Sequence, residues 1–461
     1  MFFRLLSNHY HLQTHPQTEA EIINNRARRY SSVVEIKTNE TVSPADMAAV
    51  HQFWATQSYF FIKRLQMNQK PLLKILPLEL KSENVFSKRN ILMVLERIIN
   101  ELDKKTCSDE MKRQLLALLV PPSSHSLERK IPLEEKKPAD LSVLKADSID
   151  FAYQQARQGK RVLIMDAANS QRPGAGAYEK GTFQEALTRQ SDLYWQTLVD
   201  FRDVSQDLAH AGKNILKKTD HSIDILSYQI RFLKLILFFS KKSIEDHRYF
   251  ETADFRKHFF NYADSIYGDM QNTVLEVPTS HGFLKQTVMA DLGNIKKSHE
   301  LFDKDGIFLK NLQEQKMQPL LIGEVAAPDK RLIEGIYDRA CTQNRDLAQS
   351  RQDQVAAEII RNSIEFILKK AIEQGVDILI LNAFGCGAFK NSPQQVASIF
   401  SEALLASARD LAGKAIYFMD TNQTRCDSFD QVFSDKLKDK FNLNNYQREE
   451  ALSVWRAKNS P

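Results

Sequence analysis

The sequence predicts an α/β fold, a mixed sheet flanked by helices, with an N-terminal helical region and a helical insertion. Two observations lead to this prediction. Two apolar runs, residues 162–165 and 376–382, each continue into a glycine-containing loop and then into a helix with a clear start signal. Apolar runs and amphipathic segments also alternate from residue 140 to 425, as in a sheet covered by helices on both faces.

Composition places the chain among globular proteins. Its 461 residues are 43% hydrophobic, enough for a sizeable core and for two or three domains. The 63 basic and 58 acidic residues leave a net charge of +5 without a dominating basic run, so we expect no nucleic-acid function. No run reaches the roughly 18 uncharged apolar residues of a membrane span, and we expect none.

The cysteines predict a reducing, cytoplasmic location, because they are scattered and show no metal-site spacing. They are Cys107, Cys341, Cys386 and Cys426. We therefore expect no metal and no cofactor. Cys386 lies between two glycines, and with no histidine near it in sequence we expect a small loop residue rather than a nucleophile.

The first part of the chain is predicted to be helical. Residues 1–42 are polar and are expected to form a loosely ordered leader. Residues 43–120 begin with a Ser-Pro helix start and continue with apolar residues at three- and four-residue spacing. Residues 121–141 are rich in proline and charge, which is typical of a linker.

The α/β domain is expected at residues 142–430. Asp147 is a helix cap, and Gly159 ends that helix just before the first strand. Residues 204–266 contain long apolar stripes, and we expect a helical insertion there, either simply packed or forming a partner-binding surface or a lid. Further along, residues 320–325 and 415–419 are predicted strands, residues 354–375 a long helix, and residues 431–461 a C-terminal tail.

The first glycine loop is Pro173-Gly174-Ala175-Gly176, whose small side chains let an anion approach backbone N–H groups. Thr182 and Glu185 fit a capping box, which places Glu185 in the first turn of the next helix. The glycine spacing matches neither the dinucleotide fingerprint nor the nucleoside-triphosphate loop. From composition alone, a ligand loop and an ordinary strand-to-helix connection both remain open.

The second glycine loop, residues 383–391, precedes a helix start in which Ser392 is the cap and Pro393 the first helical residue. In an α/β sheet, ligands bind beyond the carboxyl ends of the strands. Two such loops side by side can hold both phosphates of a diphosphate.

These motifs resemble the microbial poly(ADP-ribose) glycohydrolase-like macrodomains over about residues 140 to 425. That family has an Asn after a strand, a Pro-Gly-Gly-Gly loop, then Gln-Glu-Glu and Ser-x-Leu-Tyr. This chain has Asn169, the first glycine loop, Gln184-Glu185-Ala186 and Ser191-Asp192-Leu193-Tyr194. The Gly-Cys-Gly-x-Phe-x-Asn loop at residues 385–391 is also similar, and Ala327-Pro328-Asp329 stands where the family has Ala-Pro-Asn.

The chain departs from the family pattern at three positions. Ala175 replaces the middle glycine of the loop, and Asp329 replaces an Asn. Ala186 stands where the family has its catalytic Glu. The resemblance implies hydrolysis of an ADP-ribosyl bond through an oxocarbenium-like state, which needs a carboxylate. The candidate catalytic carboxylates are therefore Glu185, Asp329 and Asp338.

The resemblance also implies an ADP-ribose site. Its expected binding residues are Asp166, Asn169, Gly174, Ala175, Gly176, Ala177, Gln184, Gly385, Cys386, Gly387, Ala388 and Phe389. The substitution of the family's catalytic Glu by Ala186 favours mono-ADP-ribose over poly(ADP-ribose) as the substrate. The extra aspartate at position 329 suits an arginine-linked substrate, because carboxylates hold a guanidinium in a bidentate way.

The additional helical segments resemble secreted bacterial macrodomain effectors of the MavL type. This likeness implies ubiquitin-linked ADP-ribose as a target, a protein partner at the helical regions, and the host cytosol as location. Two alternatives remain open beside the hydrolase. In the first alternative, the chain is a non-catalytic reader that binds ADP-ribose or ADP-ribosylated protein. In the second, it is an interaction protein whose helices bind a partner.

Overall fold

The computed structural model describes residues 91–104, 107–119, 137–168, 183–194, 283–289, 318–328, 345–387 and 389–443, and single residues within 52–64 and 230–241. The chain divides into two compact units. The first comprises residues 1–122, 171–277 and 290–317, and the second residues 123–170, 278–289 and 318–461.

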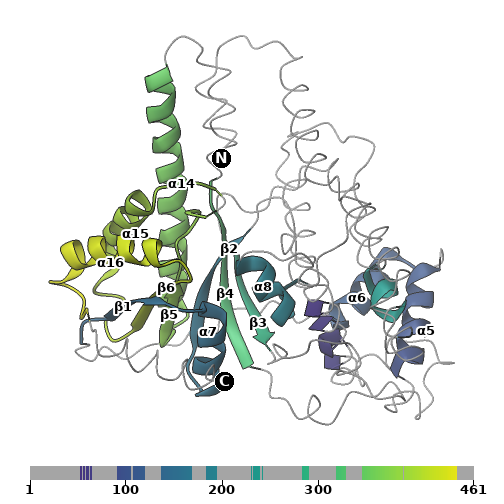
Figure 1. Cartoon of the computed structure of the whole chain (residues 1–461). Helices are drawn as coiled ribbons and strands as arrows, with labels where there is room; N and C mark the ends of the chain where they lie inside the picture. The colour runs from purple at the N-terminus through teal and green to yellow at the C-terminus, as the bar shows by residue number, and fades with distance from the viewer. Residues whose placement is uncertain are drawn as a thin grey trace. The chain divides into compact units, whose positions relative to one another are not determined.

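The second unit is built on a six-stranded sheet with the strand order β1-β6-β5-β2-β4-β3 (Figure 1). All neighbouring pairs are parallel except β3 and β4, which are antiparallel. The elements of the unit, in chain order, are β1 (Asp140–Lys145), α7 (Ser148–Arg157), β2 (Val162–Ala168), β3 (Phe283–Met289), β4 (Gln318–Ala326), α14 (Arg345–Glu373), β5 (Ile378–Leu381), α15 (Pro393–Ser407), β6 (Ala415–Asp420) and α16 (Gln423–Leu437). The predicted fold class, a mixed sheet flanked by helices, is confirmed.

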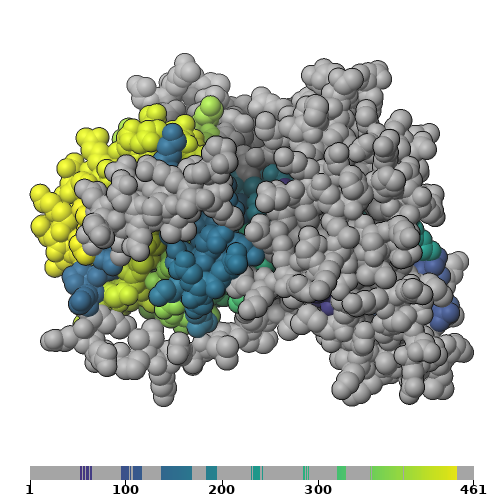
Figure 2. Space-filling view, turned by 60° about the horizontal axis from the view of Figure 1, so that its bottom comes forward, coloured from purple at the N-terminus to yellow at the C-terminus, as the bar shows by residue number. Residues whose placement is uncertain are grey.

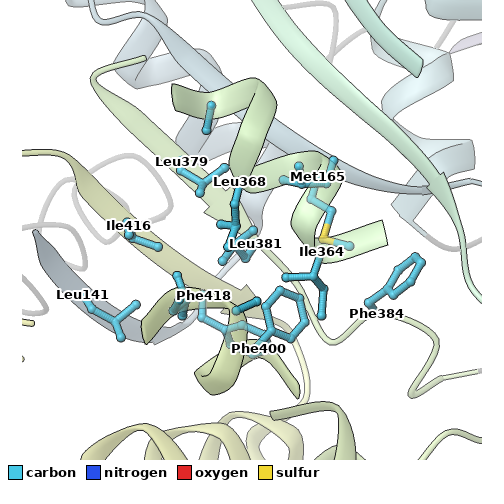
Figure 3. Packing of buried hydrophobic residues seen from close by; sticks show 14 of the residues in the cluster. Leu141, Met165, Ile364, Leu368, Leu379, Leu381, Phe384, Phe400, Ile416 and Phe418 are labelled. Atoms are coloured by element: carbon cyan, nitrogen blue, oxygen red, sulfur yellow. The ribbon is translucent and has the colours of Figure 1, made fainter. Parts of the chain in front are cut away.

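One face of the sheet packs against α14, α15 and α16. Alternate strand residues such as Met165, Leu381 and Phe418 point into this core, where they meet Ile364 of α14 and Phe400 of α15 (Figure 3). Gly323 lies on the same face, and a Cβ added there would come within 2.2 Å of Ile367 Cδ1. A glycine at this position therefore lets α14 approach β4 closely.

The opposite face is covered by α7. Phe151 of α7 packs edge-on against Tyr417 of β6, with ring centroids 4.8 Å apart. The α7 segment forms part of the molecular surface, seen in blue in the space-filling view (Figure 2). Because both faces are covered, the central strands are buried almost throughout, which explains the continuous apolar runs of β2 and β5.

The helix signals in the sequence act as predicted. The Asp147 carboxylate accepts from the backbone N–H groups of Ile149 and Asp150, at 2.8 and 3.3 Å, and caps α7. The Ser392 hydroxyl accepts from the N–H of Gln395 and caps α15. Gly159 follows α7 with φ +81, a left-handed conformation that suits glycine.

Three elements were missed by the sequence analysis. β1 begins at Asp140, inside the expected linker, and β3 lies in a stretch that received no assignment. Both are edge strands that mix polar and apolar residues without a regular alternation, so they lack the apolar runs of the central strands. α16 runs on to Leu437, and its buried Phe433 and Leu437 extend the packed structure into the expected C-terminal tail.

The described part of the first unit is mainly helical. It contains α5 (Ile91–Asp103), α6 (Asp109–Leu119) and α8 (Phe183–Gln190), and the described residues between 52 and 64 are also helical. Within the expected N-terminal helical region, residues 91–103 and 109–119 and the described residues of 52–64 are helical, as are residues 230, 232–238 and 241 of the expected insertion. The leader, most of the linker and the rest of the insertion lie outside the described residues. Within the described part of the chain, no helix has the length and apolarity to cross a membrane.

Candidate functional site

The carboxyl ends of β2, β4, β5 and β6 lie at the same end of the sheet, because these strands are parallel. From β2 the chain continues to strands on one side of the sheet, β3 and β4, whereas from β5 it continues to β6 on the other side. The gap between the ends of β2 and β5 is therefore the topological switch point of the sheet. Ligands of open α/β sheets bind at such a point.

A side-chain hydrogen bond joins the two strand ends at this switch point. The Asn382 amide, directly after β5, donates to the backbone carbonyl of Met165 in β2 at 2.8 Å. The next residue along β2 is Asp166, whose side chain is fully buried on the face opposite the α14 core. Asp166 thus belongs to the switch point, where the sequence analysis placed a ligand-binding residue.

Asp166 has charged neighbours on the same face of the sheet. Glu324 of β4 is its register partner, and Lys285 of β3 forms an ion pair with Glu324. The side chains of Lys285 and Glu324 are only 4% and 3% exposed. Two carboxylates and one ammonium group therefore lie in adjacent strands beneath the surface. The sequence analysis missed this cluster because β3 was not predicted.

The second glycine loop connects β5 to α15 and is closed by its own hydrogen bonds. The N–H of Cys386 donates to Ala383 O at 3.0 Å, and the N–H of Asn391 donates to Gly385 O at 3.2 Å. The Asn391 side-chain amide also donates to the carbonyl oxygens of Gly385 and Pro328, at 3.0 Å each. This last bond ties the loop to the end of β4, so two of the family-like motifs lie together.

The two glycines of this loop differ in what surrounds them. Gly385 has φ +71, and a Cβ there would lie 2.4 Å from Asn391 Nδ2 and 2.8 Å from the Cβ of Ala327. Gly387 is exposed, and a Cβ there would meet nothing within 4 Å. Among the described residues, neither glycine N–H donates a hydrogen bond. Gly385 is therefore required by packing, whereas Gly387 leaves open space for an approaching group.

Cys386 is not set up as a nucleophile. Burial raises the pKa of its thiol to about 12, an effect that nearby Arg425 opposes and Asp420 reinforces. The thiol is therefore protonated at neutral pH. The sequence-based expectation of a small loop residue agrees with this finding.

Arg425 lies near the carboxyl end of β6, and it was not among the predicted site residues. Its guanidinium makes two hydrogen bonds to Asp420 at the end of β6, Nε to Oδ2 at 3.0 Å and Nη2 to Oδ1 at 2.7 Å. The arginine side chain is 27% exposed. The only signal in the sequence was an aspartate at a strand end five residues before an arginine in the first turn of a helix.

The helix with the family-like Gln-Glu pair, α8, belongs to the first unit. Gln184 is buried, and Glu185 and Ala186 are half-buried in its first turn. Arg189, one turn further, is nearly buried. Burial lowers the pKa of Arg189, and the carboxylate of Glu185 raises it again. The two side chains therefore lie close enough to attract each other.

The structure describes about half of the predicted site residues. Asp166, Gly385, Cys386, Gly387 and Phe389 are in the second unit, and Phe389 packs partly against the core. Gln184 and Glu185 are in the first unit. Outside the described residues lie Asn169, Gly174, Ala175, Gly176, Ala177, Thr182, Asp329, Asp338 and Ala388. Their roles, and the binding role of every site residue, stay predictions.

No family model matches the chain, and no curated protein matches it. Among solved structures, poly(ADP-ribose) glycohydrolase from Thermomonospora curvata bound to the inhibitor ADP-HPD has 18% sequence identity, over 64% of this chain and 79% of that chain, at a TM-score of 0.34. The glycohydrolase from Deinococcus radiodurans in complex with ADP-ribose has 17% identity, over 64% and 85%, at a TM-score of 0.35. Both likenesses are weak.

Proposed function

We propose that this chain binds ADP-ribose and hydrolyses an ADP-ribosyl bond, releasing ADP-ribose from mono-ADP-ribosylated protein. The observation that carries the proposal is the Asn391 hydrogen bond to Pro328. It draws together the loop after β5 and the end of β4, two segments that resemble the same ADP-ribose-processing family. A closed loop with an exposed glycine, next to a topological switch point, suits a diphosphate.

In this proposal the ligand approaches the exposed Gly387 and the end of β2 near Asp166. Gly387 offers a backbone N–H and no side chain, so an oxygen of a phosphate can come close. A carboxylate such as Asp166 accepts hydrogen bonds from hydroxyl or amino groups of a nucleoside. Arg425 adds a positive charge at the same end of the sheet, although Asp420 already neutralises much of it.

The chemical step requires a carboxylate that positions water or handles a proton at the anomeric carbon. Glu185 is our first candidate, because it lies in the first turn of α8 and is partly accessible. Asp329 and Asp338 are sequence-based candidates for the same step. An arginine-linked substrate fits a carboxylate-rich site best, because carboxylates bind a guanidinium in a bidentate way. Ubiquitin remains a candidate target on the resemblance alone.

The second candidate function is a reader that binds ADP-ribose without cleaving it. Ala186 favours this reading, because it replaces the catalytic Glu of the family and has no group that transfers a proton. The third alternative is an interaction protein whose helical regions bind a partner. Binding of a partner there is compatible with either the hydrolase or the reader.

One experiment separates the hydrolase from the reader. The full chain is incubated with proteins carrying mono-ADP-ribose on arginine, on glutamate or on serine, and free ADP-ribose is measured over time. Release from at least one linkage is the expected result, with arginine fastest. Binding of ADP-ribose in calorimetry without any release identifies a reader, and absence of both binding and release refutes the proposal.

A further inference from the structure

Residues far upstream complete the C-terminal end of α8. The last carbonyl groups of a helix have no partner within the helix and need one from elsewhere. The Gln57 side-chain amide donates to the carbonyl oxygens of Thr188 and Ser191, at 3.2 and 3.1 Å. The Ser191 hydroxyl donates to Leu187 O at 2.8 Å. The end of α8 is therefore capped in part by a side chain more than a hundred residues earlier in the chain.

A buried ion pair links the same two segments. The guanidinium of Arg64 binds the carboxylate of Asp192, just beyond α8. The two side chains are 11% and 1% exposed, and burial lowers the pKa of Arg64 to about 9. A pair taken out of water in this way holds its partners in one arrangement, because either charge alone would be strongly disfavoured there.

An aromatic cluster adds a third link. The ring of Phe53 packs edge-on against Tyr194, with centroids 5.0 Å apart, and Tyr194 also packs against Phe232 at 5.1 Å. Phe53 and Phe232 are 6.3 Å apart. All three side chains are buried. The Tyr of the Ser-x-Leu-Tyr motif is thus enclosed by one residue from the N-terminal region and one from the insertion.

We propose that Phe53, Gln57 and Arg64 are positioning residues for the segment from Gln184 to Tyr194. An eight-residue helix such as α8 is too short to be stable by itself and takes its geometry from its packing. Its last turn and the residues just beyond it are held by three separate contacts from residues 53–64. Because a helix is stiff over two turns, these contacts also set where Gln184 and Glu185 lie.

The N-terminal helical region is therefore part of the machinery that orients α8, rather than a separate appendage. The consequence for catalysis rests on the proposed function, whereas the orientation of α8 does not. The two can be tested separately.

The first test measures hydrogen exchange in the full chain. The variants are Gln57→Leu, which keeps the bulk of the side chain but loses the donor, and Arg64→Met, which loses the charge. We expect amides in peptides covering 184–194 to exchange about tenfold faster in both variants, because an uncapped or unpaired end opens more often. Peptides from α15, residues 393–407, report global unfolding and are expected to exchange as in the wild type.

The matched control is Arg113→Met in α6, the same substitution at another arginine of the first unit. The Arg113 guanidinium pairs with Glu110 of its own helix, with Nε 3.4 Å from Oε2. It should leave exchange at 184–194 unchanged. If Arg64→Met also unfolds the second unit, Gln57→Leu decides the question, since it removes no charge. Wild-type exchange at 184–194 in a folded Gln57→Leu protein overturns the proposal.

The second test uses turnover and includes a conservative rescue. Arg64→Met is expected to lower kcat for ADP-ribose release by about tenfold or more with a smaller effect on KM, since misplacement of a catalytic group acts on the chemical step. Arg64→Lys, which keeps the charge, should recover most of the loss. Equal kcat in wild type and Arg64→Met removes the catalytic consequence. A wild type without binding or release refutes the proposed function and leaves the exchange result to decide the positioning.

Discussion

The Asn391 side-chain amide lies 3.0 Å from the carbonyl oxygen of Pro328 and joins the loop after β5 to the end of β4. The same nitrogen is 3.0 Å from Gly385 O, so one side chain holds the loop closed and anchors it. The Asn391 side chain is buried, so these hydrogen bonds are shielded from water. Its place in the Gly-x-Phe-x-Asn motif is therefore explained by loop geometry.

Replacing Asn391 should destabilise the second unit and disorganise the loop. Asn391→Ala leaves two carbonyl oxygens without this donor, and we expect a loss of about 1–3 kcal/mol in the free energy of unfolding. Urea denaturation measures the loss. Gln394→Ala is the control, because Gln394 is exposed and its two hydrogen bonds are long: it donates to Ser428 Oγ at 3.3 Å and accepts from Ser392 Oγ at 3.4 Å. Equal stability of the two variants would contradict the anchoring role.

The two glycines of the loop should respond differently to substitution. Gly387→Val has room in the fold, so the protein should stay folded while ADP-ribose affinity falls by about tenfold or more, because the side chain blocks an approaching phosphate. Gly385→Ala should instead lower stability, since its Cβ would collide with Asn391 and Ala327. Calorimetry and thermal unfolding separate the two effects. Unchanged affinity in folded Gly387→Val removes this loop from the binding site.

Glu185→Gln tests a chemical role for the carboxylate on α8. Gln retains the shape and hydrogen-bonding reach, so stability should change by less than about 1 kcal/mol. Turnover should fall by about 100-fold or more while ADP-ribose binding persists. Asp329→Asn is tested separately in the same assay. Wild-type turnover in both variants excludes these two carboxylates from the mechanism.

Ala186→Glu is the complementary change. Ala186 is half-buried, so a longer side chain has a route to solvent and the variant should fold. Restoring the family's glutamate is expected to create or raise cleavage of poly(ADP-ribose), measured as released ADP-ribose from the polymer. A stable variant with no gain would show that the geometry around position 186 differs from the family's.

The buried pair of Lys285 and Glu324 should be sensitive to loss of one partner. Lys285→Met removes the ammonium group beside a carboxylate that is 3% exposed, and we expect a loss of about 3–5 kcal/mol. Arg361→Met is the comparison, since the Arg361–Glu402 pair is 42% and 48% exposed and should contribute less than about 1 kcal/mol. The free energy of unfolding of both variants is measured with denaturant. If Lys285→Met and Arg361→Met lose similar amounts, the buried cluster next to Asp166 is contradicted.

Several features of the molecule were determined by the sequence alone. The caps at Asp147 and Ser392, the buried strands β2 and β5 and the glycine loop after β5 were all predicted, because each depends on residues within a few positions of one another. Local signals of this kind act through backbone propensity and short-range hydrogen bonds. They were sufficient to predict an α/β sheet with helices on both faces.

Other features were decided only by the tertiary structure. Edge strands β1 and β3 take their conformation from pairing with β6 and β4, which are separate segments of the chain, so their own residues give a weak signal. The bond from Asn391 to Pro328 spans 63 positions, and that from Gln57 to Thr188 spans 131. Arg425 is near enough to Cys386 to lower the pKa of its thiol, and this proximity likewise depends on the pairing of β5 with β6. Contacts over such separations depend on how the chain packs, and no local pattern encodes them.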